Sequence, residues 1–404
     1  MSAELQDSTS DYLKSLRVAI VHYWFVGRAG GERVVESIAE VFPQADIFTL
    51  VLRPESLAPV LKRRKITTSF LQKLPFVNRF HRHFLFLQPL ALEQFDLSGY
   101  DLVISSESGP AKGVLTSPKT LHICYCHSPM RYIWDMYPQY VSGMSKIVRA
   151  IFSLTAHYVR IWDYATASRV DEFVSNSQFV SARIRKFYGR ESTVIHPPVD
   201  AEQASIGTEQ EDFYLTVGRL VGYKRNDLAI EACKRMGRRL RIIGDGPEYK
   251  NLKRMAGTAV EFLGSASDQE VRENYSKCRA LLFCGEEDFG IVPVEAQAYG
   301  KAVIAYGSGG VLETVRGLAD ERMGDAAEDP TGIFFYEQST DALVDAMQRF
   351  EANSERFVPS RIRSHALEFD VAVFREKLTD FVLQSLAAHD AKMAGGRGKQ
   401  KSFV

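Results

Sequence analysis

The chain has 404 residues, which is long enough for two domains of ordinary size, and its 45% hydrophobic content can fill a core in each. Its 50 basic and 50 acidic residues balance, so no overall charge favours nucleic acid as a partner. Five scattered cysteines without a CxxC pair argue against a disulfide framework or a structural zinc site. These features predict a folded, two-domain protein of a reducing cytoplasm.

The first half of the chain has the alternating pattern of a parallel α/β sheet. Residues 1–16 are polar and lack the features of a secretory signal, so we expect a frayed lead-in. An apolar strand at 17–22 then leads through a glycine-bearing loop into a helix at 32–42. Five further strand candidates alternate with helical stretches, at 47–51, 101–105, 121–125, 172–175 and 193–195. Residues 1–200 are therefore predicted to form one Rossmann-like domain.

A second α/β pattern follows Pro197, Pro198 and the polar stretch 201–212. It predicts strands at 213–217, 240–243, 260–263, 280–283 and 302–305, with helices at 225–236, from 248 and at 268–277. We therefore expect a second Rossmann-like domain over 201–367.

The last part of the chain is amphipathic and then polar. After Arg361 the pattern predicts a final helix or pair of helices, of which about 368–390 returns to pack on the first domain, through Phe369, Val373, Phe374, Leu378, Phe381, Val382 and Leu386. We expect residues 391–404 to be a disordered tail, because their glycines and positive charges bury nothing. No segment approaches the roughly 20 uninterrupted apolar residues of a membrane-spanning helix.

Positive charge and aromatic side chains meet in the first domain. The basic run Lys62-Arg63-Arg64-Lys65 precedes the apolar residues Phe70, Leu71, Leu74, Phe76, Phe80, Phe84, Leu85, Phe86 and Leu87. Such a surface attracts anionic headgroups, and the segment 146–152 adds to it. Core helices with solvated cations are the alternative interpretation.

His127 follows the apolar strand 121–125, so it is expected at a sheet edge, where its ring can hydrogen-bond a sugar hydroxyl. A structural histidine is the alternative. Cys124 and Cys126 lie too close in sequence to His127, with no other ligands nearby, for a metal site or a cysteine nucleophile.

Two glycine loops of the second domain follow predicted strands. Gly218, Arg219 and Lys224 are placed at the carboxyl edge of the sheet, where Arg grips phosphate oxygens and Lys supplies compact positive charge. Gly244 and Gly246 begin like a dinucleotide fingerprint, but Tyr249 stands where its third glycine would be. This argues against a nicotinamide dehydrogenase, and the absence of a GK[ST] loop argues against a P-loop ATPase. Solvated cations and a plain strand-to-helix turn are the alternatives.

The segment 285–300 is the most informative. It places Glu287 and Glu295 around Gly290 and a helix-starting Pro293. Glycine lets main-chain amides approach a ligand, the helix start offers unpaired N–H groups, and the carboxylates accept hydrogen bonds from sugar hydroxyls. The turn 307–313 supplies further amides. Two solvated acids beside a core helix are the alternative.

In combination, these segments resemble the family-four glycosyltransferases of GT-B type. The resemblance covers nearly the whole chain and is most specific at 218–224, 244–247 and 287–295, the last matching the paired-glutamate signature of the family. The segment 127–135, with 95–98 upstream, is similar to bacterial mannosyltransferases that build O-antigen or other surface polysaccharides. The implied fold is α/β, with an acceptor-side domain and a nucleotide-sugar domain facing across a cleft.

The resemblance implies roles for individual residues. Arg219 and Lys224 would hold the donor diphosphate, and Glu295 the ribose hydroxyls. Glu287 and the main chain of Phe289, Gly290 and Ile291 would hold the transferred sugar, which His127 would also touch. Gly30 and Gly31 match a flexible loop near donor and acceptor, and Gly218, Gly244 and Gly246 would help to bind the donor. His127, Arg219, Lys224 and Glu287 are thus the candidate catalytic residues.

The implied reaction is transfer of mannose from GDP-mannose to a hydroxyl of a lipid-linked glycan, with retention and without an essential metal. This chain contains no Asp-x-Asp segment. The implied location is the cytoplasm, at the inner face of the cytoplasmic membrane. A UDP-sugar donor, a nucleotide-sugar epimerase and a binding-only protein remain alternatives, because the same contacts serve each of them.

Overall fold

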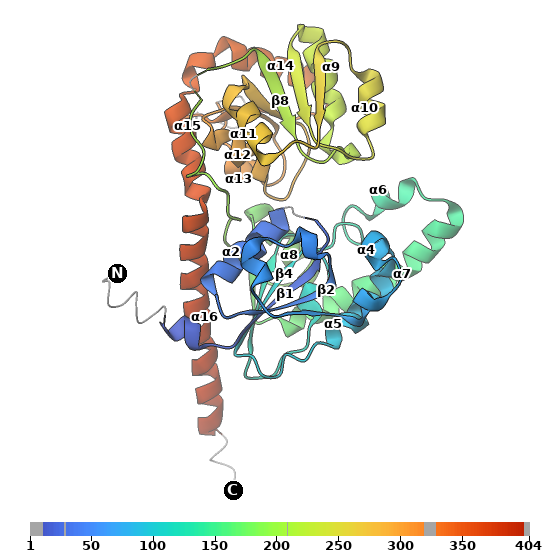
Figure 1. Cartoon of the computed structure of the whole chain (residues 1–404), viewed down its shortest axis with the longest axis vertical. Coiled ribbons are helices and arrows are strands. Elements are labelled where there is room, and N and C mark those ends of the chain that lie inside the picture. Colours follow the sequence, from blue (N-terminus) through green and yellow to red (C-terminus); the bar gives the residue numbers. More distant parts are fainter. Residues whose placement is uncertain (1–10, 28–29, 208, 319–328, 400–404) are drawn as a thin grey trace. The chain divides into compact units, whose positions relative to one another are not determined.

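The structure is a computed structural model that describes residues 11–27, 30–207, 209–318 and 329–399, with side chains to Ala394 (Figure 1). The chain divides into two compact units, unit 1 with residues 1–196 and 374–404 and unit 2 with residues 197–373. The boundary predicted after residue 200 lies a few residues beyond the one observed.

Unit 1 is built on a seven-stranded sheet in the order β3-β2-β1-β4-β5-β6-β7, with every neighbouring pair parallel. Its strands are β1 (Val18–Phe25), β2 (Asp46–Leu52), β3 (Ile66–Thr68), β4 (Leu102–Glu107), β5 (Leu121–Cys126), β6 (Glu172–Ser175) and β7 (Thr193–Val194). All residues of β4 and β5 are buried, as in a sheet covered on both faces. The six strands expected here are confirmed, and β3 is an additional edge strand.

Helices connect these strands. They are α2 (Gly30–Val41), α3 (Pro59–Lys62), α4 (Val77–Phe80), α5 (Gln88–Glu93), α6 (Tyr137–Ser142), α7 (Lys146–Thr166) and α8 (Gln178–Tyr188). Short 3₁₀ turns lie between them: η1 (Pro54–Ser56), η2 (Phe70–Lys73), η3 (His81–Leu87), η4 (Ala111–Gly113) and η5 (Ala167–Arg169).

The last helix, α16 (Val371–Lys399), completes the core of unit 1. Its side chains Phe374, Leu378, Val382 and Leu386 are buried in one cluster with residues of β1 and α2. The ring of Phe374 meets the ring of Tyr125 on β5 at a centroid distance of 5.8 Å. The prediction of a helix that returns to the first domain is therefore confirmed.

The predicted disordered tail differs from the structure, because α16 continues through residues 391–399. Ala391, Lys392, Met393 and Ala394 are good helix formers and contain no stop signal, so they prolong α16. Residues 400–404 lie outside the described part of the chain.

Unit 2 is built on a six-stranded parallel sheet in the order β10-β9-β8-β11-β12-β13. Its strands are β8 (Phe213–Val217), β9 (Arg239–Ile243), β10 (Val260–Gly264), β11 (Ala280–Phe283), β12 (Val303–Tyr306) and β13 (Gly332–Phe335). The central strand order reverses at β8 and β11, and in such sheets ligands bind beyond the carboxyl ends of the strands. The predicted strands are confirmed, and β13 was not anticipated.

The helices of unit 2 are α9 (Asn226–Met236), α10 (Tyr249–Met255), α11 (Asp268–Lys277), α12 (Ile291–Ala298), α13 (Val311–Thr314), α14 (Thr340–Ala352) and α15 (Pro359–Ala366). The 3₁₀ turns are η6 (Gly222–Lys224), η7 (Ser354–Arg356) and η8 (Leu367–Phe369). The predicted helices at 225–236, from 248 and at 268–277 correspond to α9, α10 and α11.

The packing of α16 gives a first prediction. Leu378→Ala should lower the free energy of unfolding of unit 1 by about 2–5 kcal/mol, because it leaves a cavity at a fully buried position. Glu376→Ala, at an exposed position of the same helix, should change it by less than about 0.5 kcal/mol. Urea denaturation, monitored by hydrogen exchange of the β1 and α2 amides, measures the change in free energy for both variants. Equal effects would show that α16 does not complete this core.

Candidate active site

The loop after β8 holds the first cluster of predicted site residues. Gly218 has a φ of 134°, and its N–H donates to the carbonyl of Ile243 over 2.9 Å. A Cβ at this position would lie 2.7 Å from Lys224 Nζ. The absence of a side chain at Gly218 is therefore what leaves room for the Lys224 ammonium group.

Lys224 forms an ion pair with Glu287, with 2.8 Å between Nζ and Oε1. Both side chains are largely buried, at 17% and 23% exposure. Burial alone would lower the pKa of Lys224, but the charge and hydrogen bond of Glu287 outweigh it and raise that pKa. The loops after β8 and β11 thus hold a cation and an anion against each other.

The residue after Lys224 fixes the end of this loop. Arg225 adopts a left-handed backbone conformation with a φ of 49°. Positive φ values are uncommon for residues other than glycine. Its guanidinium pairs with Asp227 in the first turn of α9, with 3.0 Å between Nη2 and Oδ2. This local ion pair helps to hold Lys224 at the start of the helix.

Arg219 is the exposed cation of the same loop. Among the described residues its guanidinium makes no ion pair or hydrogen bond. It therefore has all of its donors available for an anionic ligand.

The glycines after β9 pack against the β8 loop. A Cβ at Gly244 would lie 1.9 Å from the carbonyl oxygen of Gly218, and one at Gly246 would lie 2.2 Å from that of Leu220. The Leu220 N–H donates to the Asp245 carbonyl over 2.9 Å. The observed role of these two glycines is close packing of loops, and their contact with a donor stays a prediction.

The acidic segment after β11 is supported in the same way. A Cβ at Gly309 would lie 2.4 Å from the Glu287 carbonyl oxygen, which accepts the Gly310 N–H over 2.9 Å. Phe289 is buried, and Gly290, with φ 93°, precedes the first residue of α12, Ile291. Within the described residues no side chain caps the start of α12, and the first backbone N–H groups of a helix have no hydrogen-bond partner within the helix.

Glu295 lies one turn further along α12. Its Oε2 accepts a hydrogen bond from the Tyr275 hydroxyl over 3.1 Å, and the Tyr275 ring stacks on Tyr299 at 5.7 Å. Tyr275, which was not identified from the sequence, therefore orients this carboxylate. The structure brings together Gly218, Lys224 and Glu287 directly, whereas Glu295 is held by a separate hydrogen bond.

In unit 1, His127 directly follows β5. Its backbone N–H donates to the backbone carbonyl of Glu107 over 2.6 Å, and its ring Nε2 lies 2.9 Å from the Ser106 hydroxyl oxygen. Burial, and to a smaller extent the charge of His22, lower the pKa of His127 to about 3. The ring is therefore neutral at neutral pH and can accept or donate a hydrogen bond.

The start of α2 lies against His127. A Cβ at Gly31 would lie 3.7 Å from His127 Nε2, and Gly30 is the first residue of this helix. His22 on β1 places Nε2 4.0 Å from the buried carboxylate of Glu32. The glycine loop and the histidine predicted for this site are thus brought together, and His22 and Glu32 are neighbours that the sequence did not reveal.

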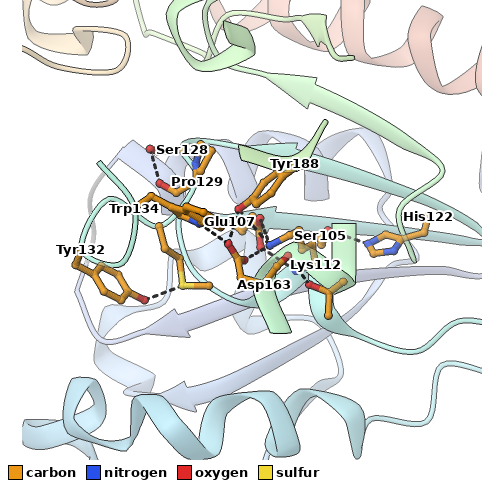
Figure 2. A network of polar contacts seen from close by, with 12 residues as sticks. Ser105, Glu107, Lys112, His122, Ser128, Pro129, Tyr132, Trp134, Asp163 and Tyr188 are labelled. Carbon is orange, nitrogen blue, oxygen red and sulfur yellow. Dashed lines mark hydrogen bonds and ion pairs between the residues drawn. The ribbon is translucent and has the colours of Figure 1, made fainter. Parts of the chain in front are cut away.

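Figure 2 shows a buried ionic network next to this region. Lys112 pairs with Asp163, and its Nζ lies 3.4 Å from Glu107 Oε1, with all three side chains fully buried. Asp163 also accepts from Trp134 Nε1 over 2.8 Å and from the Tyr188 hydroxyl over 3.0 Å. Burial raises the pKa of Glu107 to about 7 despite the attraction of Lys112, and Asp163 adds to the rise.

This network links β4, η4, α7 and α8 beneath the peptide that carries His127. This network was not predicted from the sequence, because a lysine after a glycine-proline turn is usually solvated.

Within the described residues, no group of three or more His, Cys, Asp or Glu side chains could hold a metal ion. The absence of a metal requirement stays a prediction. No helix in the described part of the chain is long and apolar enough to cross a membrane.

Comparison with known families assigns both halves of the chain. Residues 28–203 match the family described as Glycosyltransferase Family 4, and residues 199–363 match Glycosyl transferases group 1. The two matches therefore cover both units.

Three relatives illustrate the similarity. An uncharacterized glycosyltransferase of Methanocaldococcus jannaschii is 31% identical over 38% of this chain and 44% of its own length. The alpha-1,3/1,6-mannosyltransferase ALG2 of Saccharomyces cerevisiae is 25% identical over 74% of this chain and 69% of its own length. The match to ALG2 of Candida glabrata covers 53% of that protein, so the chain spans about half the length of the archaeal relative and of this one.

Solved structures give the fold. The crystal structure of Anabaena HepE in complex with UDP has a TM-score of 0.67 and 15% identity, over 91% of this chain and 100% of that chain. The same Anabaena protein has been solved with UDP-glucose. With the two parallel sheets and the two family matches, these similarities establish that the chain belongs to the family-four glycosyltransferases and has the GT-B fold.

Proposed function

We propose that the chain transfers mannose from GDP-mannose to a hydroxyl of a lipid-linked glycan, with retention at the anomeric carbon. The observation that carries the proposal is the Lys224–Glu287 ion pair, held between glycine loops at the carboxyl edge of the unit 2 sheet beside the exposed Arg219. Mannose is supported by the mannosyltransferase relatives. A UDP-sugar is the second candidate donor, because the Anabaena neighbour binds UDP-glucose.

The proposed chemistry follows from charge development. As the bond between the anomeric carbon and the phosphate oxygen breaks, the sugar becomes cationic and the leaving diphosphate gains negative charge. Arg219 and Lys224 stabilise the diphosphate, and Glu287 positions the sugar. The acceptor hydroxyl attacks the same face, and the leaving phosphate takes its proton. Neutral His127 hydrogen-bonds a sugar hydroxyl, and Glu295, oriented by Tyr275, binds the ribose.

A donor screen followed by turnover tests this function. The stabilising donor should raise the melting temperature by mass action, corresponding to about 2.7 kcal/mol at a donor concentration of about 100 Kd. Glu295→Ala should lose most of this stabilisation, and Glu273→Ala, an exposed acid of α11, should keep it. With undecaprenyl-linked saccharide as acceptor, NMR of the product should show the donor's anomeric configuration.

Two results would contradict the proposal. Conversion of the donor sugar to its epimer without an acceptor would indicate an epimerase. Donor binding without turnover on any acceptor glycan would indicate a binding-only protein.

The ion pair gives a second prediction for catalysis. Lys224→Met should reduce kcat by about 10²–10³, since it removes the charge that stabilises the leaving diphosphate. Lys234→Met makes the same chemical change at an exposed position of α9 and should leave kcat unchanged. Steady-state kinetics with circular dichroism to verify folding measures the difference. An unchanged kcat in Lys224→Met would remove Lys224 from the mechanism.

His127 gives a pH-dependent prediction. Its pKa of about 3 in the folded state lies below the ordinary value of about 6.5, so only the unfolded chain takes up the proton as the pH falls. The stability contributed by the neutral ring is complete above about pH 6.5 and is lost as the pH falls towards 3. When the pH falls from about 7 to about 5, the free energy of unfolding should therefore decrease by about 1–2 kcal/mol less in His127→Asn than in the wild type.

Urea denaturation at both pH values measures this difference. His122, whose pKa burial lowers to about 4, contributes with the same sign in both proteins and cancels. Parallel pH dependence of the two proteins would mean that His127 is protonated equally in the folded and unfolded states.

A further inference from the structure

Positive charge is concentrated in two stretches of unit 1, although the whole chain is balanced. Residues 56–92 contain seven Lys and Arg, residues 136–162 contain three, and neither stretch contains Asp or Glu. The two stretches meet in the fold, because Leu85 of η3 packs with Ala156 and Val159 of α7. Helix α4 leads directly into η3, which contacts α7. The basic stretches therefore form one region of unit 1.

Helix α7 has one buried face and one exposed apolar face. Ala156, Val159, Asp163 and Thr166 form its buried face. On the opposite side an apolar stripe repeats at intervals of four, three, four and three residues and is 51–75% exposed, through Ile147, Ile151, Leu154, Tyr158 and Ile161. A surface helix normally presents polar residues there, so this stripe lacks a partner within the described chain.

The neighbouring segment of α4 and η3 adds aromatic side chains. Phe76, Phe80 and Phe86 are 78%, 41% and 51% exposed. Phe76 has a left-handed φ of 57°, a strained conformation for a bulky residue, and presents its ring almost fully to solvent. Large exposed apolar patches mark interaction sites.

Five exposed cations lie in the segments that carry these side chains. Lys73, Arg79 and Arg82 are exposed in the α4 region, and Lys146 and Arg149 are exposed at the start of α7. Within the described residues, none of these five forms an ion pair with a carboxylate. By helical periodicity Lys146 and the exposed His157 lie along one flank of the apolar stripe, whereas Arg149 lies on the side of α7 away from it.

Two of the four residues of the basic run 62–65, which was expected to take part, are engaged elsewhere in unit 1, while Lys62 and Arg63 are exposed. Arg64 donates to the carbonyls of Ala39, Phe42 and Pro43 at the end of α2, and Lys65 lies 3.8 Å from Asp46. Leu71 and Leu85 from the predicted apolar set are buried in the core. The available surface is therefore narrower than the sequence suggested, and it includes α7 along its whole length.

We propose that the α7 surface, defined as the exposed stripe of α7 with Phe76, Phe80 and Phe86, docks on an anionic lipid bilayer. Apolar side chains would enter the interface while the surrounding cations meet lipid phosphates. A second copy of this chain is a poorer fit, because two such surfaces would place like charges together. The proposal does not depend on the identity of donor or acceptor.

An environment-sensitive fluorophore tests the depth of docking. All five native cysteines are buried, so a cysteine introduced by Leu154→Cys takes a thiol-reactive nitrobenzoxadiazole label selectively. Vesicles of phosphatidylcholine with about 30% phosphatidylglycerol should shift its emission to the blue, and vesicles of phosphatidylcholine alone should not. Met255→Cys, at an exposed apolar position of unit 2, should show no shift.

Vesicle sedimentation of the unlabelled full chain supplies the second measurement. Ile151→Glu with Leu154→Glu should weaken partition by about tenfold or more, and Ile206→Glu with Met255→Glu, which adds the same charge elsewhere, should change it much less. Lys146→Gln with Arg79→Gln should weaken binding to the anionic vesicles. Circular dichroism verifies that each variant folds.

Three outcomes would overturn the proposal. These are equal binding to neutral and anionic vesicles, absence of any vesicle-dependent shift at Leu154→Cys, and a dimer in analytical ultracentrifugation that Ile151→Glu dissociates while vesicles bind no protein. The last outcome would assign the α7 surface to self-association.

Discussion

The ion pair between Lys224 and Glu287 is the constraint on which the architecture of the unit 2 site depends. Two largely buried charges lose hydration, and their mutual attraction must compensate for that loss. Gly218, Gly285 and Gly309 allow this geometry, since a Cβ at each would lie within 2.8 Å of Lys224, Tyr223 or Glu287 atoms. Three loops far apart in sequence thereby converge on a single pair of charges, which is positioned before any ligand arrives.

Unit 1 uses a buried cation in a different way. Lys112 is fully enclosed and meets two carboxylates, Glu107 and Asp163, so its charge is compensated within the fold. Asp163 belongs to the buried face of α7, and Glu107 receives the His127 N–H through its carbonyl. The same network therefore anchors α7 from inside and supports the peptide that presents His127. The charges of this unit 1 network therefore have a structural role. In unit 2, by contrast, the exposed Arg219 of the same loop as Lys224 has donors available for a ligand.

The strands and the order of the loops followed from the sequence because buried parallel strands are short apolar runs bounded by glycine and proline. Strand β3 was missed because three residues, Ile-Thr-Thr, carry too little pattern. Helix α7 was not delimited, and its apolar periodicity points to the wrong face, because the regular apolar stripe is exposed whereas the buried face carries Asp163 and Thr166. The positions of Lys224 and Glu287 were predicted, but their pairing was not, since it depends on contacts between loops of distant sequence. The packing role of Gly244 and Gly246 was hidden for the same reason.

The apolar outer face of α7 is unfavourably exposed to water unless a partner covers it. The contacts of the inner face hold the helix in place despite this exposure. Asp163, Ala156 and Val159 fix α7 to unit 1 through a network and a core that do not involve the stripe. The residues of the outer face are therefore not needed to hold α7 in the fold, and they can bind a partner. If the acceptor is lipid-linked, confinement of enzyme and acceptor to one bilayer raises their effective concentration without a new contact at the reacting centre. A surface for the bilayer and a site for the sugar can then be built on separate elements of the same chain.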